Sequence, residues 1–154
     1  MRLARKIGMS SYRSSIEWEE RFGNRRANET TDHPFAFEFT VESYLRAVAK
    51  RFADNFDANA YLYLSRAMDW FDVGYHGASA TDALRRLSGK SVGVISVTTD
   101  QLFPPRQQEL LANALTAAGV ETTYTVVSSL KGHDAFLVDI KRMGPVINHF
   151  INGE

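Results

Sequence analysis

The alternation of strand and helix patterns in the last third of this chain most constrains its fold. Residues 91–98 (SVGVISVT) form a short, nearly continuous β-branched run, which is typical of a parallel strand buried on both faces. The pattern then predicts a helix over 104–118, a second strand over 122–127 and a last helix over 139–150. This order predicts right-handed crossovers on a parallel sheet, so the fold class is α/β.

Two parallel strands are too few for an independent sheet of this kind. Such a sheet needs helices on both faces and further strands along its edges. We therefore expect residues 89–154 to be one part of a larger α/β domain.

Residues 1–88 have a different, helical and loop-rich character, and we treat them as a separate segment. The pattern predicts helices over 15–22, from 41 to about 57, over 59–71 and over 81–87, with Ser15 and either Ser79 or Thr81 as N-caps. The sequence leaves the state of residues 2–11 open and predicts loops at 24–35 and 74–77. The helix at 59–71 is apolar around much of its circumference, so it needs partners on more than one side.

Composition excludes several classes of function. The formal charge is zero, with 18 basic and 18 acidic residues, so no basic field indicates nucleic-acid binding. No apolar run approaches the ~18 residues that span a bilayer, and the N-terminus lacks the apolar core of a secretory signal. The absence of cysteine excludes disulfides and thiolate chemistry and fits a cytoplasmic location. His33, His76 and His149 show no metal-ligand spacing, so we expect no metal site.

Asp100 and His133 are the residues most suited to chemistry. Asp100 follows the first predicted strand and His133 follows the second, so both emerge at the carboxyl edge of the sheet, where functional residues gather. There a carboxylate can fix the tautomer of an imidazole that accepts a proton. Taken singly, Asp100 is equally well a helix cap and His133 a surface residue. Their order across successive strand ends favours a functional pair.

We find no nucleophile to accompany this pair. A strand-to-helix elbow of the form G-x-S-x-G is the usual site of a nucleophilic serine. The string GASAT at 77–81 lacks the second glycine and follows no predicted strand. The chain order Ser, Asp, His of such enzymes would place the serine upstream of Met1.

The strings TDQLFPP at 99–105 and GHDAFL at 132–137 give the chain a family resemblance. With ESYL at 42–45, FDANAYL at 56–62 and RAMD at 66–69, they resemble the C-terminal half of the homoserine O-acetyltransferase family. These acyltransferases have the α/β-hydrolase fold. The resemblance implies that residues 89–154 are the C-terminal part of that fold and that residues 1–88 are its helical lid. It also implies that Asp100 and His133 are the acid and histidine of the catalytic triad.

The resemblance further implies three substrate-binding residues. Arg5 and Tyr12 stand at the family spacing in ARKIGMSSYRS at 4–14, where Arg5 is expected near the carboxylate of the amino-acid acceptor. Asp134 matches the residue that holds the amino group of that acceptor. A guanidinium and a carboxylate suit the two charges of a zwitterion. From the residues alone, a solvated basic side chain is the preferred interpretation of Arg5, while Tyr12 can be a core or interface aromatic and Asp134 a loop cap.

The function implied is transfer of an acetyl group from acetyl-CoA to the hydroxyl of L-homoserine, in methionine biosynthesis, by a ping-pong mechanism. Acyl-CoA is a co-substrate, and we expect no bound cofactor. The alternatives are succinyl transfer to serine or homoserine, and a truncated interaction protein without catalysis. The resemblance implies a homodimer for the full-length protein. We expect this chain alone to be inactive, either as a gene fragment or as a product that pairs with a separate N-terminal half.

Overall fold

The computed structural model describes residues 1–27, 33, 35–36 and 39–153. Its sheet, within these ranges, has two parallel strands, β1 (Ser91–Val97) and β2 (Glu121–Val127). They pair in register from Ser91 beside Glu121 to Val97 beside Val127. Helix α6 (Pro105–Ala117) joins them, and α8 (Ile140–Asn152) follows β2. The predicted α/β class, with both strands and their helices, is confirmed.

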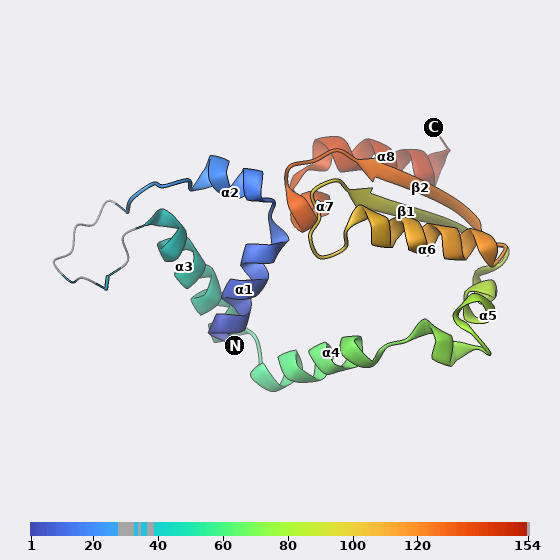
Figure 1. Cartoon of the computed structure of the whole chain (residues 1–154), viewed down its shortest axis with the longest axis horizontal. Coiled ribbons are helices and arrows are strands. Elements are labelled where there is room, and N and C mark those ends of the chain that lie inside the picture. Colours follow the sequence, from blue (N-terminus) through green and yellow to red (C-terminus); the bar gives the residue numbers. More distant parts are fainter. Residues whose placement is uncertain (28–32, 34, 37–38, 154) are drawn as a thin grey trace.

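Helices cover both faces of this small sheet (Figure 1). On one face Val94 packs with Leu115 and Ala112 of α6, and on the other Val97 packs with Met143 of α8. The prediction that β1 is buried along its whole length is wrong for its first half, because Ser91 and Gly93 are exposed. Since β2 is the one strand paired with β1 in the described chain, the other edge of β1 has no strand beside it.

The described residues before β1 form helices joined by turns and loops, as predicted, with differences at the ends of elements. The elements are α1 (Arg2–Tyr12), α2 (Ser15–Arg21), α3 (Thr40–Asn55), α4 (Ala58–Trp70), η1 (Val73–His76), α5 (Ala80–Leu84) and η2 (Arg85–Leu87). The segment left open at 2–11 is thus a helix, and the predicted loop at 74–77 winds into a 3-10 turn. Ser14, not Ser15, caps α2 by accepting a hydrogen bond from the Glu17 amide, and Ser79 caps α5. Part of the predicted loop at 24–35 lies outside the described residues.

Helix α4 packs against little of the described chain. It has no buried residue, and Tyr63 and Trp70 are 79% and 67% exposed. The whole chain exposes 11006 Å², whereas a compact monomer of this mass exposes about 7,800 Å². The partners that this helix was predicted to need are therefore not found among the described residues of the chain. No described helix is both long and apolar enough to cross a membrane.

The helical segment contacts the α/β part near both of its ends. Helix α5 packs against α6, and α1 packs against the short turn η3 (Gly132–Asp134), which is followed by α7 (Ala135–Val138). Figure 1 shows α1 and α2 beside α7, at the carboxyl ends of the strands. The N-terminal helices therefore reach the edge of the sheet that carries Asp100 and His133.

Candidate active site

The ends of the two strands bring Asp100 and His133 together. Past the sheet, the Thr98 amide still donates to the Val127 carbonyl at 3.0 Å, and the Asp100 amide turns back to Val97 at 3.1 Å. The Thr99 hydroxyl then joins the two loops, because it donates to the Ser129 carbonyl at 2.7 Å and accepts from the Gly132 amide at 3.1 Å. Backbone hydrogen bonds and the Thr99 hydroxyl thus hold together the two loops that carry Asp100 and His133.

The carboxylate of Asp100 is held at both oxygens. Oδ1 accepts the backbone amides of Leu102 at 2.8 Å and Phe103 at 3.0 Å, and Oδ2 lies 3.0 Å from Nδ1 of His133. Because a carboxylate only accepts hydrogen bonds, Nδ1 carries the proton in this pair. The second ring nitrogen, Nε2, is then left to accept a proton from a substrate.

Aromatic rings surround the imidazole of His133. The ring centroids of Tyr12, Phe103 and Phe136 lie 5.6, 5.3 and 5.9 Å from that of His133. Asp100, Phe103, His133 and Phe136 also line a cavity of about 330 Å³ that runs along β1 between α6 and α8. The acid and the histidine therefore share a partly apolar hollow.

Helix α1 brings Arg5 and Tyr12 to the same place. The Arg5 guanidinium carbon lies 5.5 Å from the centre of the Tyr12 ring and 4.7 Å from that of Phe52. Its Nε is buried without a hydrogen-bond partner, and no described carboxylate pairs with this arginine. The structure thus brings Arg5, Tyr12, His133 and Asp100 into one row, with an uncompensated cation at its end.

Asp134 has a protein partner that sequence reasoning missed. Its Oδ2 lies 3.0 Å from Nε of Arg13, whose Nη1 donates to Oε1 of Glu17 at 2.7 Å. Arg13 stands in the YRS end of the family string, but its pairing with a residue near the other end of the chain has no signal in local spacing. The carboxylate expected to meet an amino group is therefore already in one ion pair.

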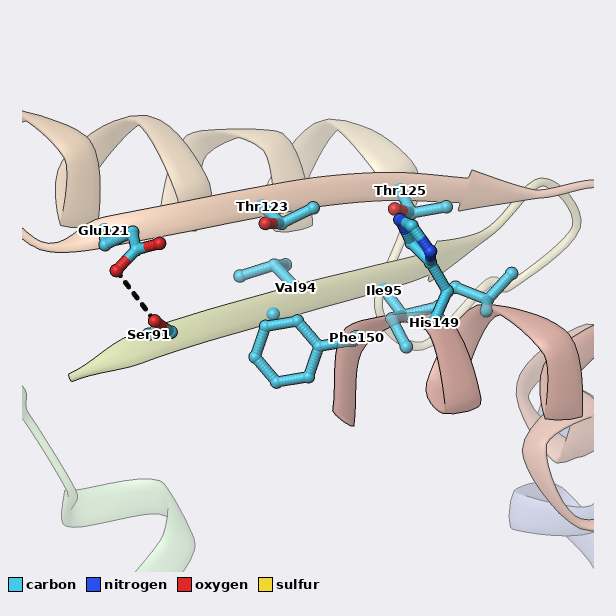
Figure 2. A pocket seen from close by; sticks show the side chains of 10 residues that line it. Ser91, Val94, Ile95, Glu121, Thr123, Thr125, His149 and Phe150 are labelled. Atoms are coloured by element: carbon cyan, nitrogen blue, oxygen red, sulfur yellow. Dashed lines mark hydrogen bonds between the residues drawn. The ribbon is translucent and has the colours of Figure 1, made fainter. Parts of the chain in front are cut away.

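The string GKSVG at 89–93 fits the pattern G-x-S-x-G letter by letter, and sequence reasoning overlooked it. Ser91 opens β1, at the end of the strand opposite to Asp100, and its hydroxyl donates to Oε2 of Glu121 at 2.8 Å. Both residues line a separate hollow of about 190 Å³. Figure 2 shows them at one end of it, with Phe150 and His149 of α8 lying over the strands. This serine begins a strand rather than following one, and it lies at the far end of the sheet from His133, so it is no nucleophile for His133.

A buried hydrogen bond supports the loop from β2 to His133. The Ser129 hydroxyl donates to Oδ2 of Asp139 at 2.6 Å, and Nη1 of Arg142 lies 2.9 Å from the same oxygen. The Ser129 hydroxyl, aided by the Arg142 guanidinium, lowers the pKa of Asp139 below its ordinary value, against the opposing effect of burial. No cluster of three metal-ligating side chains occurs among the described residues.

Comparisons with known proteins found relatives that match nearly the whole chain. The chain is 48% identical to a serine O-succinyltransferase of Litchfieldella anticariensis over 98% of its length and 45% identical to one of Stenotrophomonas maltophilia over 99%. It spans 42% of each relative. The crystal structure of a homoserine O-acetyltransferase from Bacillus anthracis matches with a TM-score of 0.81 at 21% identity, over 98% of this chain and 40% of the other. No protein-family model matches.

These findings confirm the family resemblance and the fold. The homologues cover nearly the whole chain, including both site strings, and the solved structure shows that the chain has part of an α/β-hydrolase fold. The specific roles of the five site residues stay predictions that rest on the geometry above.

Proposed function

We propose that this chain supplies the acid, the histidine and the acceptor-binding residues of an O-acyltransferase that acylates a hydroxy amino acid from acyl-CoA. The observation that carries this proposal is the Asp100–His133 pair. One oxygen of the carboxylate is occupied by two backbone amides and the other by Nδ1. An imidazole held in this way presents Nε2 as a general base.

The reaction has two half-reactions that use His133 in the same way. A serine supplied by the rest of the protein gives its proton to Nε2 and attacks the thioester carbonyl, and the departing thiolate takes that proton. The acceptor hydroxyl then gives its proton to Nε2 and attacks the acyl-serine, and the serine oxygen recovers the proton. Asp100 stabilises the imidazolium in both steps without becoming protonated itself.

Arg5 supports an amino-acid acceptor. Arg5 is only partly buried, but its Nε is shut off from solvent without a hydrogen-bond partner, so a ligand carboxylate there would supply the contact that the described chain does not. Arg5 lies in a row with Tyr12 and His133, so a carboxylate bound to Arg5 would bring the rest of a small acceptor toward the imidazole. The free Oδ1 of Asp134 remains available for the ammonium group.

Serine as acceptor and succinyl-CoA as donor are the leading choice, because relatives at 48% and 45% identity carry the name serine O-succinyltransferase. Homoserine and acetyl-CoA, which the motif resemblance implies, are the second candidate. The competing class of protein is an interaction protein without catalysis. The exposed apolar surface of α4 favours this class. Under the catalytic proposal that surface is covered in the full-length protein, by its other part or by a second copy.

The test is a graft of this chain into the Litchfieldella relative, replacing the part that it matches. Acyl transfer from succinyl-CoA and acetyl-CoA to serine and homoserine is measured for the graft. A His133→Ala graft is the control for chemistry that does not use the pair. We expect activity in the first graft and its loss in the second, with the preferred pair of substrates identifying donor and acceptor. A folded graft that is inactive with all four combinations contradicts the proposal.

A further inference from the structure

Four charged side chains form a compact group beside His133. Arg13 contacts Glu17 through Nη1 at 2.7 Å and Asp134 through Nε at 3.0 Å, and Nζ of Lys131 lies 3.4 Å from Oε1 of Glu17. The side chains of Arg13, Glu17 and Asp134 are only 16%, 8% and 15% exposed. Charges held at this depth interact strongly, and breaking such a pair leaves its partner uncompensated.

Two neutral contacts fasten the same segments. The Ser14 hydroxyl donates to the Leu130 carbonyl while it accepts from the Glu17 amide. Gly132 has a φ of +63°, and a Cβ there would lie 2.6 Å from the Tyr12 carbonyl oxygen. Only glycine fits at this approach. We name the paired segments 13–17 and 130–134 the clasp.

The clasp bears directly on the catalytic imidazole. Arg13 pairs with Asp134, which directly follows His133 in the chain. Arg13 also directly follows Tyr12, whose ring lies beside the imidazole. The Arg13 guanidinium thus links two residues that border His133. On the other side, the Gly132 amide is held by Thr99. Apart from ring contacts, the His133 side chain has a single hydrogen bond among the described residues, the one to Asp100.

We propose that Arg13 is a positioning residue that, by bridging Glu17 and Asp134, holds the His133 loop at the distance where Nδ1 meets Asp100. This inference rests on the proposed function. Arg13 touches no reacting atom, and it acts through the loop. The contact of Nε with Asp134 is an ion pair without a hydrogen bond, whereas Nη1 donates a hydrogen bond to Glu17. A lysine at position 13 keeps the charge but not the planar group that reaches both carboxylates, so it satisfies the bridge only in part.

Kinetics of the graft give the first test. Arg13→Gln should lower kcat roughly 10- to 100-fold, since small displacements of a catalytic group cost that much. Both half-reactions should slow because both use His133. The acylation half-reaction isolates this effect, since it does not involve the contact of Asp134 with the acceptor. Arg13→Lys should restore part of the rate. Asp134→Asn combined with Arg13→Gln should cost no more than the larger single effect, and Arg86→Gln, an exposed arginine far from the clasp, should be neutral.

Three kinetic outcomes overturn the inference. These are an unchanged kcat, a loss confined to acceptor KM, and a loss that tracks thermal unfolding and is not restored by lysine. An inactive parent graft instead counts against the proposed function.

A spectroscopic measurement tests Arg13 without any activity. A proton shared between an imidazole and a carboxylate resonates far downfield of ordinary amide protons. In the histidine-labelled 154-residue chain, this signal should be present in the parent, Arg13→Lys and Arg86→Gln forms. It should be lost in Arg13→Gln while the strand amide signals persist. Its absence from the parent, or its persistence in Arg13→Gln, overturns the inference.

Discussion

The α/β part and the helical segment differ in where their apolar side chains lie. Around β1 and β2, apolar residues form two clusters, one under α6 and one under α8. In the helical segment α3 buries one residue and α4 buries none, although both are rich in apolar side chains. The first region carries a core of its own, whereas the second presents apolar surface for something else to cover. The clasp is the place where the helical segment contacts the loop of the α/β part that carries His133.

The largest expected effect lies in the α/β part. Asp100→Asn in the graft should lower kcat about 10,000-fold, because an amide no longer fixes the imidazole tautomer. Steady-state acyl transfer measures this loss, and Glu109→Gln, exposed on α6, is the matched acid-to-amide control. Retention of more than a tenth of the activity would show that the pair is a structural relic.

Stability should separate the two regions next. Leu115→Ala removes a side chain that is 3% exposed in the cluster under α6, and should cost about 2–5 kcal/mol of unfolding free energy. Leu62→Ala makes the same change in α4, where the leucine is 66% exposed, and should cost less than about 0.5 kcal/mol. Urea unfolding of the 154-residue chain compares the two. Equal costs would mean that α4 is packed in solution, contrary to the contrast above.

A smaller effect tests whether the helical segment takes part in binding. Arg5→Gln in the graft should raise KM for the acceptor roughly 10- to 100-fold, the value of a charge-assisted contact to a carboxylate. The acylation half-reaction, followed by thiol release, should be unaffected. Arg2→Gln removes a charge from the same helix at an exposed pair with Asp54 and serves as the control. A loss of acylation in Arg5→Gln would assign this arginine to the donor instead.

The smallest effect concerns pH. The Ser129 hydroxyl lowers the pKa of Asp139, so the folded state favours the charged carboxylate. Its stabilisation is present above the ordinary aspartate value of about 4 and is lost as pH falls through the lowered value. Asp139→Asn should therefore lower Tm by a few degrees at pH 7 and by less at pH 3. A Tm difference that grows toward low pH would show that the charged form of Asp139 does not stabilise the folded state.

Local pattern predicted the parts of the fold that local physics determines. The β-branched run at 91–98 and the helix at 104–118 agree with β1 and α6 to within a residue at each end, and the strand-end rule brought Asp100 to His133. The first half of β1 is more exposed than expected, because burial depends on neighbours that one strand cannot reveal.

The local sequence pattern could not predict ion pairs between residues that are far apart in the chain. Arg13 looks like any basic residue in a polar string, and its role depends on a carboxylate near the other end of the chain. The same holds for Ser91, where the letters of a serine elbow occur at the wrong end of a strand. In both cases the deciding information is three-dimensional.

The clasp joins two segments that the ribosome synthesises far apart in time. Ser14 and Leu130 are 116 residues apart, so at a synthesis rate of about 5–20 residues per second the ribosome needs roughly 6 to 23 s to bring the second after the first. During that time the N-terminal helices have been synthesised, but the second half of the clasp has not. The catalytic pair is therefore positioned only after nearly the whole chain has been synthesised.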